Sequence, residues 1–228
     1  MDIISNLLRR IVATSAGTKT TTNRFSFEDC LQFLEATGKK VHGEGFRIYP
    51  EDHKLIFTLL VYFLEDGENA QKLGINLRKG ILLTGPVGCG KTSLMRLMRY
   101  MLPRKKTFYL KTCREVGLEF NVEGYRVLQQ YGRNSLYWRE DGYVPKTYCF
   151  DDLGSEGTGR YYGNECNVME EILLTRYEYF ISNHMVTHLT TNFSSSELEK
   201  LYGSRVRSRL REMCNLVSFG REAKDRRS

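Results

Sequence analysis

The sequence predicts an α/β fold in which a parallel sheet is flanked by helices. Three observations lead to this prediction. Short apolar segments alternate with stretches of helical periodicity from residue 80 onward, a pattern typical of parallel strands joined by helices. The first apolar segment runs into a glycine-rich loop, and a later one ends on two aspartates. The chain has 228 residues, enough for one such domain with a short appendage.

The composition is that of an ordinary globular protein. Hydrophobic residues make up 41% and charged residues 27% of the chain. No apolar run approaches the roughly 18 residues that a membrane span needs, and the N-terminus lacks the features of a signal peptide. We therefore expect a cytoplasmic protein, in which the six cysteines, none in a C-x-x-C pair, are reduced thiols.

The chain is basic, with a net charge of +7 and a pI of about 9.1. Such an excess favours an anionic partner, and nucleic acid is the usual one. A basic surface without a specific partner is the alternative, and charge alone does not separate the two.

We expect three parts along the chain. Residues 1–24 combine a short apolar helix candidate with a Ser/Thr/Gly/Lys stretch and are expected to be a flexible N-terminal segment. Residues 25–70 are expected to form a small helical N-terminal extension packed on the core. Residues 71–228 contain the alternating segments and are expected to form that core.

Two helices are expected in the N-terminal extension. Ser26, with Asp29 three residues later, resembles a capping box, so a helix should begin here and end at Gly38. Pro50 and the acidic residues after it open a second helix, because proline and acids are favoured in a first turn. This second helix has a broad apolar stripe and should stop near Gly67.

The core segments alternate in type. The expected strands are residues 81–83, 107–110, 147–150, 186–190 and 216–219. The expected helices are residues 93–101, 113–131, 167–181 and 198–213. This order predicts parallel pairing in a sheet covered by helices on both faces.

A phosphate-binding loop follows the first strand. Its residues match G-x-x-x-x-G-K-[ST] and are Gly85, Pro86, Val87, Gly88, Cys89, Gly90, Lys91 and Thr92, with Ser93 next to them in the expected binding set. Glycines allow the backbone to wrap around phosphates, so that N–H groups at the start of a helix face the anion. Lys91 should reach the β- and γ-phosphates of ATP, and the Thr92 hydroxyl should bind Mg²⁺. The alternative is a glycine-rich turn with a buried or solvated lysine.

Two acids follow the strand at residues 147–150. An aspartate at such a strand end positions Mg²⁺ in phosphate-loop enzymes, which is the role expected of Asp151. Asp152 can act as general base on the attacking water. Glu156 is a second candidate base, and a turn-forming aspartate pair without catalytic function is the alternative to both.

A polar residue and an arginine-rich helix follow. Asn192 comes after the strand at residues 186–190 and could orient the attacking water, or simply cap or turn the chain. Arg205 and Arg209 are four residues apart and share one helix face. An arginine supplied to a neighbouring subunit stabilises the charge of the transition state in some ATPases. A solvated basic face or a contact to nucleic-acid phosphates is the alternative.

Five segments, in this order, resemble the DnaC/IstB family of AAA+ ATPases, which are helicase loaders and transposition helpers. They are the phosphate loop, Asp151–Glu156, Thr175-Arg176-Tyr177, Thr190–Phe193 and Gly203–Leu210. The resemblance covers roughly residues 75–222. It implies an AAA+ fold without a C-terminal helical lid, and a homo-oligomer in the ATP-bound state, because an arginine finger completes the site of the next subunit.

The resemblance also assigns roles to single residues. Asp151 matches the Mg²⁺-binding Walker B acid, Asp152 its catalytic neighbour and Asn192 the sensor asparagine. Arg205 and Arg209 match the helix that carries the finger, and the sequence does not say which of them it is. The loop after Walker B contacts single-stranded DNA in helicase loaders, and here Arg160, Tyr161 and Tyr162 would make that contact, since an arginine beside aromatics suits phosphate pairing and base stacking. An ordinary exposed turn is the alternative.

The expected function is that of an Mg-dependent ATPase that acts on DNA with a protein partner, a helicase or a transposase. One alternative is a slow-turnover, ATP-controlled adaptor that regulates a partner protein. A small-molecule kinase would also use a phosphate loop, but the paired aspartates and the Thr-Thr-Asn strand end argue against it.

Overall fold

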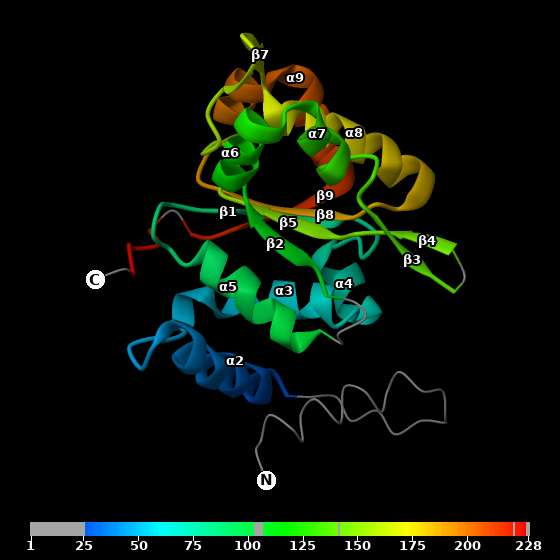
Figure 1. Cartoon of the computed structure of the whole chain (residues 1–228). Helices are drawn as coiled ribbons and strands as arrows, with labels where there is room; N and C mark the ends of the chain where they lie inside the picture. The colour runs from blue at the N-terminus through cyan, green and yellow to red at the C-terminus, as the bar shows by residue number, and fades with distance from the viewer. Residues whose placement is uncertain (1–25, 103–106, 141, 221, 227–228) are drawn as a thin grey trace. The chain divides into compact units, whose positions relative to one another are not determined.

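The structure is a computed structural model that describes residues 26–102, 107–140, 142–220 and 222–226 (Figure 1). The chain divides into two compact units. The first unit is drawn from Met1–Leu73 and Ser93–Thr107, and the second from Gly74–Thr92 and Phe108–Ser228. The flexible segment expected at residues 1–24 lies outside the described residues, and the expected boundary at residue 71 stays a prediction.

The first unit is helical. Its elements are α2 (Phe27–His42), η1 (Pro50–Asp52), α3 (His53–Phe63), α4 (Gly67–Leu73) and η2 (Arg99–Met101), together with most of α5 (Lys91–Met98), which begins in the second unit. Two aromatic rings, Phe27 on α2 and Phe57 on α3, pack edge to face with centroids 5.4 Å apart. Nowhere in the described part of the chain is a helix both long and apolar enough to cross a bilayer.

The start of α2 agrees with the sequence, but its end does not. Both hydrogen bonds of the capping box between Ser26 and Asp29 are present. The helix runs past Gly38 to His42 and ends at Gly43, whose φ is 98°. Gly38 is needed for packing instead, because a Cβ there would meet the Phe46 ring.

The predicted second helix is also interrupted. It forms as η1 and α3, and α3 ends at Phe63 rather than near Gly67. Glu65 has a positive φ of 56°, which breaks the helical path. Gly67 then begins the separate short helix α4.

The second unit is built on a five-stranded sheet in the order β2-β5-β8-β1-β9. The strands are β1 (Gly80–Thr84), β2 (Tyr109–Thr112), β5 (Tyr148–Asp151), β8 (Thr187–Thr191) and β9 (Cys214–Ser218). Every neighbouring pair is parallel, as the alternation of strands and helices predicts. The order brings β8 between β1, which leads into the phosphate loop, and β5, which ends on the acids.

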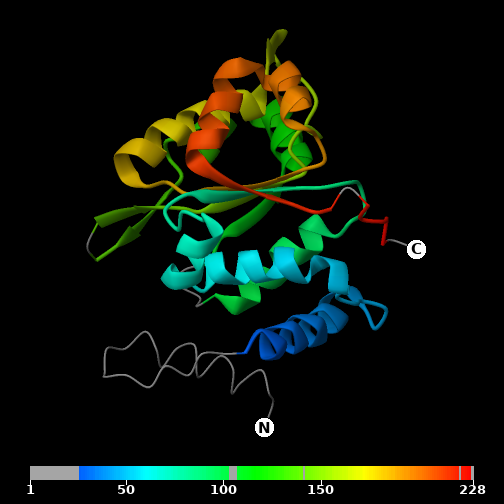
Figure 2. The ribbon, with the colours of Figure 1, turned by 180° about the vertical axis from the view of Figure 1, so that it is seen from behind.

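Four helices cover one face of this sheet (Figures 1 and 2). They are α6 (Cys113–Glu123), α7 (Tyr125–Tyr131), α8 (Val168–Asn183) and α9 (Ser195–Met213). Apolar side chains of these helices form a buried core with Phe150 and Leu189 of the sheet. The single helix expected at residues 113–131 is two helices, because Gly124 has a φ of 59° and the Tyr161 ring leaves no room for a side chain there.

Two hairpins complete the second unit, and the sequence did not predict either of them. The first joins β3 (Leu136–Arg139) to β4 (Gly142–Pro145), and the second joins β6 (Gly159–Tyr161) to β7 (Asn164–Cys166). The strands have only three or four residues each. Such short strands carry too little alternation to be recognised from sequence.

A buried arginine ties the first hairpin to the sheet. Arg176 of α8 is fully buried and donates five hydrogen bonds. Its acceptors are Thr187 Oγ1, Tyr131 O, Ser135 Oγ, Lys146 O and Val186 O. Burial lowers its pKa to about 9, so the guanidinium remains charged at neutral pH. The arginine of the Thr-Arg-Tyr segment is therefore an internal link between α7, the base of the first hairpin and β8.

Candidate functional site

The phosphate loop has the strand–loop–helix context that its motif requires. β1 ends at Thr84 and α5 begins at Lys91. Within the loop, Gly88 and Gly90 have φ values of 77° and 100°, which side-chain-bearing residues rarely adopt. The backbone is thus shaped as a concave turn at a helix N-terminus, the arrangement that binds anions.

Lys91 is held against this loop. Its side chain is largely buried, and Nζ donates hydrogen bonds to the carbonyl oxygens of Gly85 and Pro86, both at 2.8 Å. A buried ammonium that is hydrogen-bonded only to neutral carbonyls is stabilised electrostatically when an anion binds beside it. This geometry supports the expected phosphate contact, whereas the roles of Val87, Cys89 and Ser93 stay predictions.

The loop meets the acidic strand end at one point. The Thr92 hydroxyl lies 2.9 Å from each Oδ of Asp151. Asp151 is 4% exposed and also accepts a hydrogen bond of 2.7 Å from the Thr190 hydroxyl. Among the described residues no lysine, arginine or histidine forms an ion pair with it. A buried carboxylate without a counter-charge is costly, so the position favours a bound cation.

Magnesium fits these residues. It prefers hard oxygen ligands, and the usual protein contribution is one or two side chains beside the phosphates of the substrate. Thr92 and Asp151 bring a hydroxyl and a carboxylate together from two different elements. They are the residues that would hold the ion.

Asp152 is placed differently from its neighbour. It is exposed, with a φ of 59°, and its N–H donates to Thr190 Oγ1 at 2.8 Å. The turn is fixed further by the Leu153 N–H, which donates to Thr190 O at 2.8 Å. Asp151 is therefore buried and hydrogen-bonded, while Asp152 presents its carboxylate to solvent beside the same strand end.

Glu156, the second candidate base, is already engaged. Its carboxylate accepts hydrogen bonds from the Tyr202 hydroxyl and, at 2.9 Å, from the Gly154 N–H. Burial raises its pKa. The geometry thus favours Asp152, whose carboxylate has no hydrogen bond to any described residue, as the acid available to water.

Asn192 directly follows β8 and is exposed. Because β8 lies between β1 and β5, its end falls between the phosphate loop and the acids. The Gly85 N–H donates to Thr191 O at 3.3 Å, which joins the loop to this strand end. The position suits the predicted sensor role, which itself stays a prediction.

Two C-terminal residues also reach the phosphate loop, and the sequence did not predict them. The Arg226 N–H donates to Gly88 O at 3.1 Å. A Cβ at Gly88 would lie 2.0 Å from Asp225 Oδ1, so the carboxylate is directly against the loop. The only signal for this contact is topological: β9 ends beside β1, with Ser218 paired to Thr84, and so returns the chain to the loop.

The arginine helix α9 is kinked at Gly203, where φ is 79° and ψ is 167°. Arg205 follows the kink, is exposed and has no hydrogen bond or ion pair to any described residue. Arg209 donates from Nη1 to the Tyr177 hydroxyl at 3.1 Å and lies over the Tyr177 ring. The two finger candidates therefore have different surroundings.

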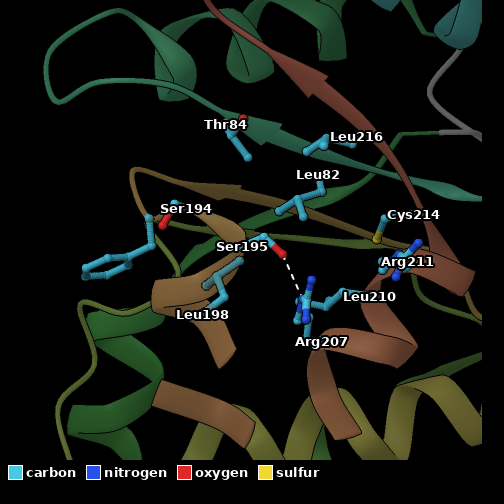
Figure 3. A pocket seen from close by; sticks show the side chains of 11 residues that line it. Leu82, Thr84, Ser194, Ser195, Leu198, Arg207, Leu210, Arg211, Cys214 and Leu216 are labelled. Atoms are coloured by element: carbon cyan, nitrogen blue, oxygen red, sulfur yellow. Dashed lines mark hydrogen bonds between the residues drawn. The ribbon is translucent and has the colours of Figure 1, made fainter. Parts of the chain in front are cut away.

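A cavity of about 150 Å³ lies beside the same helix (Figure 3). Its lining is mostly apolar and includes Leu82, Leu198 and Leu216. Arg207 at its edge donates to Ser195 Oγ at 2.9 Å and pairs with Glu199. No residue of the phosphate loop or of the acid pair lines the cavity, so it is separate from the candidate nucleotide site.

The segment expected to contact DNA is the β6–β7 hairpin. Tyr162 at its tip is 89% exposed. Arg160 pairs with Glu165 across the hairpin at 2.9 Å, and the half-buried Tyr161 packs against Phe120 of α6. Tyr162 packs edge to face against the Tyr161 ring, with centroids 4.6 Å apart, while most of its side chain stays open to solvent.

Comparisons with known proteins agree with the predicted fold. The structure of the DnaC helicase loader superposes with a TM-score of 0.52 at 18% identity, covering 78% of this chain and 95% of that one. A Streptococcus pyogenes serotype M3 protein, proposed to be a primosome component, gives the same score and identity over 77% and 83%. The resemblance to DnaC/IstB-type AAA+ ATPases is therefore confirmed for the fold.

Sequence comparison is less extensive. The ATP-dependent zinc metalloprotease FtsH 2 of Sphaerobacter thermophilus is 36% identical over 96 residues, which are 42% of this chain. The match spans only 14% of that relative's length. No family model matches the sequence.

Proposed function

We propose that this chain binds and hydrolyses Mg-ATP, and that it uses this cycle to act on DNA with a protein partner, as a replicative helicase loader or a transposition helper. The observation that carries the proposal is the contact between Thr92 and Asp151, which joins a phosphate loop to a buried carboxylate that forms no ion pair with a described side chain. The chain's AAA+ fold supports it.

The residues divide the chemistry between them. Lys91 exchanges its carbonyl partners for the β- and γ-phosphates, while the loop N–H groups receive the remaining phosphate oxygens. Bound Mg²⁺ supplies charge neutralisation at these phosphates. Asp152 accepts a proton from the attacking water, and Asn192 orients that water.

The proposed action on DNA is supported by charge and by the β6–β7 hairpin. The chain carries a net charge of +7, and the exposed Tyr162 ring offers a stacking surface for a base. A role in replication or transposition also implies that the protein is located in the cytoplasm.

Steady-state ATPase assays with and without single-stranded DNA test the proposal. We expect Mg-dependent turnover that DNA stimulates and that Lys91→Ala abolishes. The alternative, an ATP-controlled adaptor, predicts tight ATP binding with slow turnover that DNA leaves unchanged. Absence of ATP binding by the wild-type protein would contradict both.

A further inference from the structure

Tyr177, the residue after the buried Arg176, faces α9 and contacts two of its residues. Arg209 Nη1 donates to the Tyr177 hydroxyl at 3.1 Å, and the guanidinium carbon lies 4.2 Å from the centre of the ring. The hydroxyl in turn donates to Glu212 Oε2 at 2.7 Å. Glu212 and Arg209 also approach each other to 3.9 Å. Tyr177 therefore holds the Arg209 guanidinium by both ring stacking and a hydrogen bond.

The hydrogen bonds run in one direction. Arg209 has donors only, so the Tyr177 oxygen must accept a hydrogen bond from it, and the Tyr177 O–H donates a hydrogen bond to Glu212. The hydrogen bond to Glu212 raises the pKa of Tyr177, which keeps the hydroxyl protonated. The oxygen lone pairs therefore remain directed at Arg209.

The other arginines of this helix segment are held differently. Arg207 is bonded to Ser195 and Glu199 of its own helix. Arg205 is exposed and has no described partner to fix its long side chain. Of these three arginines, only Arg209 is both oriented by a neighbouring helix and still accessible, with 36% of its side chain exposed.

Orientation matters for an arginine that must meet a phosphate. A guanidinium has five N–H donors in a rigid fork, and stacking on a ring leaves most of them available. A charged group that is already oriented loses less entropy when it reaches the transition state. An arginine without such contacts would lose conformational entropy each time it is ordered during an ATPase cycle.

We propose that Tyr177, itself held by Glu212, is a positioning residue that orients Arg209 as the arginine finger for the nucleotide of a neighbouring subunit. This inference rests on the proposed ATPase function. It gives the tyrosine of the Thr-Arg-Tyr segment a role, since Arg176 anchors α8 in the core while the half-buried Tyr177 stacks on Arg209 of α9.

The test compares three substitutions in the full chain. Tyr177→Leu removes the ring and the hydroxyl, and we expect kcat for ATP to fall about 10- to 100-fold, as for a misplaced catalytic group, with little change in KM. Tyr177→Phe keeps the ring and should retain kcat within about fivefold, because the cation–π contact survives. Tyr179→Leu on the same helix is the matched control and should not change kcat.

Mixing subunits distinguishes positioning from simple damage to the fold. Tyr177→Leu subunits keep an intact nucleotide site, and Lys91→Ala subunits keep an intact Tyr177 and Arg209. The mixture should therefore turn over ATP faster than the two proteins assayed separately. Arg209→Ala mixed with Lys91→Ala should show the same gain.

Three results would overturn the inference. If Arg209→Ala is rescued by Lys91→Ala but Tyr177→Leu is not, or Tyr177→Leu has wild-type kcat, Tyr177 does not position the finger. If neither mixture gains activity although the wild-type protein hydrolyses ATP, Arg209 does not act between subunits. If the wild-type protein neither binds nor hydrolyses ATP, the proposed function itself fails.

Discussion

Charged side chains are buried at the strand ends beside the phosphate loop but accessible on the surface of α9. Asp151 is buried and bonded by two threonine hydroxyls from its own chain, and Lys91 is largely buried. Arg205 and Arg209 lie on the outside of a kinked helix. The difference indicates that the candidate nucleotide-binding groups meet within one chain, whereas the two arginines are accessible to another molecule.

Arg176 of α8 and Arg209 of α9 show a similar contrast between two arginines. All five N–H donors of the Arg176 guanidinium bind acceptors inside the protein, so none is left for a ligand. Arg209, stacked on Tyr177, keeps most of its donors. Burial and bonding, rather than the residue type, therefore separate structural arginines from candidate catalytic ones.

The largest expected effect concerns Asp152. Asp152→Asn should lower kcat about 10²- to 10⁴-fold, because a general base is lost, while ATP affinity changes little. Glu156→Gln is the comparison, and it should retain most of the activity since Glu156 is already bonded to Tyr202 and Gly154. Steady-state kinetics together with fluorescent-nucleotide binding measures both. The opposite pattern would reassign the base to Glu156.

The next effect is on stability. Arg176→Leu leaves buried carbonyl and hydroxyl groups without their donor, which should lower the free energy of unfolding by about 3 kcal/mol or more. Arg126→Leu, at a side chain that is 78% exposed, should change it by less than about 0.5 kcal/mol. Urea unfolding followed by circular dichroism provides the values. Equal effects of the two substitutions would remove the contrast between buried and surface arginines.

A smaller effect is expected at the hairpin tip. Tyr162→Ala should weaken binding of single-stranded DNA by about 1 kcal/mol or slightly more, the value of one base–aromatic stack. ATP turnover without DNA should stay at its wild-type rate. Tyr100→Ala, also at an exposed tyrosine, is the control in fluorescence-anisotropy titrations at fixed salt. Unchanged DNA affinity in Tyr162→Ala would exclude the hairpin as a stacking surface.

The smallest effect concerns the C-terminal contact. Asp225→Ala removes a carboxylate that lies against Gly88, so ATP should bind about threefold more tightly, an effect typical of one exposed charge. High salt should reduce the difference. Glu222→Ala, in the same segment, should leave affinity unchanged. Weaker ATP binding by Asp225→Ala would instead make the carboxylate a supporting contact of the loop.

The sequence predicted those parts of the site that depend on strand ends. Thr92 and Asp151 meet because a parallel sheet brings the carboxyl ends of β1, β5 and β8 to one edge, and each end carries a recognisable polar pattern. Local residue types were sufficient here, since the motif and the strand before it specify the geometry.

The remainder depends on contacts between distant segments. The C-terminal contact of Asp225 has no local signature, and the stacking of Arg209 on Tyr177 joins residues 32 positions apart. The break at Gly124 and the two hairpins arise from tertiary packing and from strands of three or four residues. Glycine at 38 misled the prediction in the same way, because it serves close packing with Phe46 rather than termination of α2.

Calorimetric titration of ATP into the wild-type protein and into Lys91→Ala, with Mg²⁺ present, tests the central claim most directly. The account predicts saturable binding to one site per chain in the wild-type protein, and an affinity at least about tenfold weaker in Lys91→Ala, which keeps its fold by circular dichroism. Equal affinity in the two proteins, or no binding by the wild-type chain, would contradict the claim that this loop and Asp151 together hold Mg-ATP.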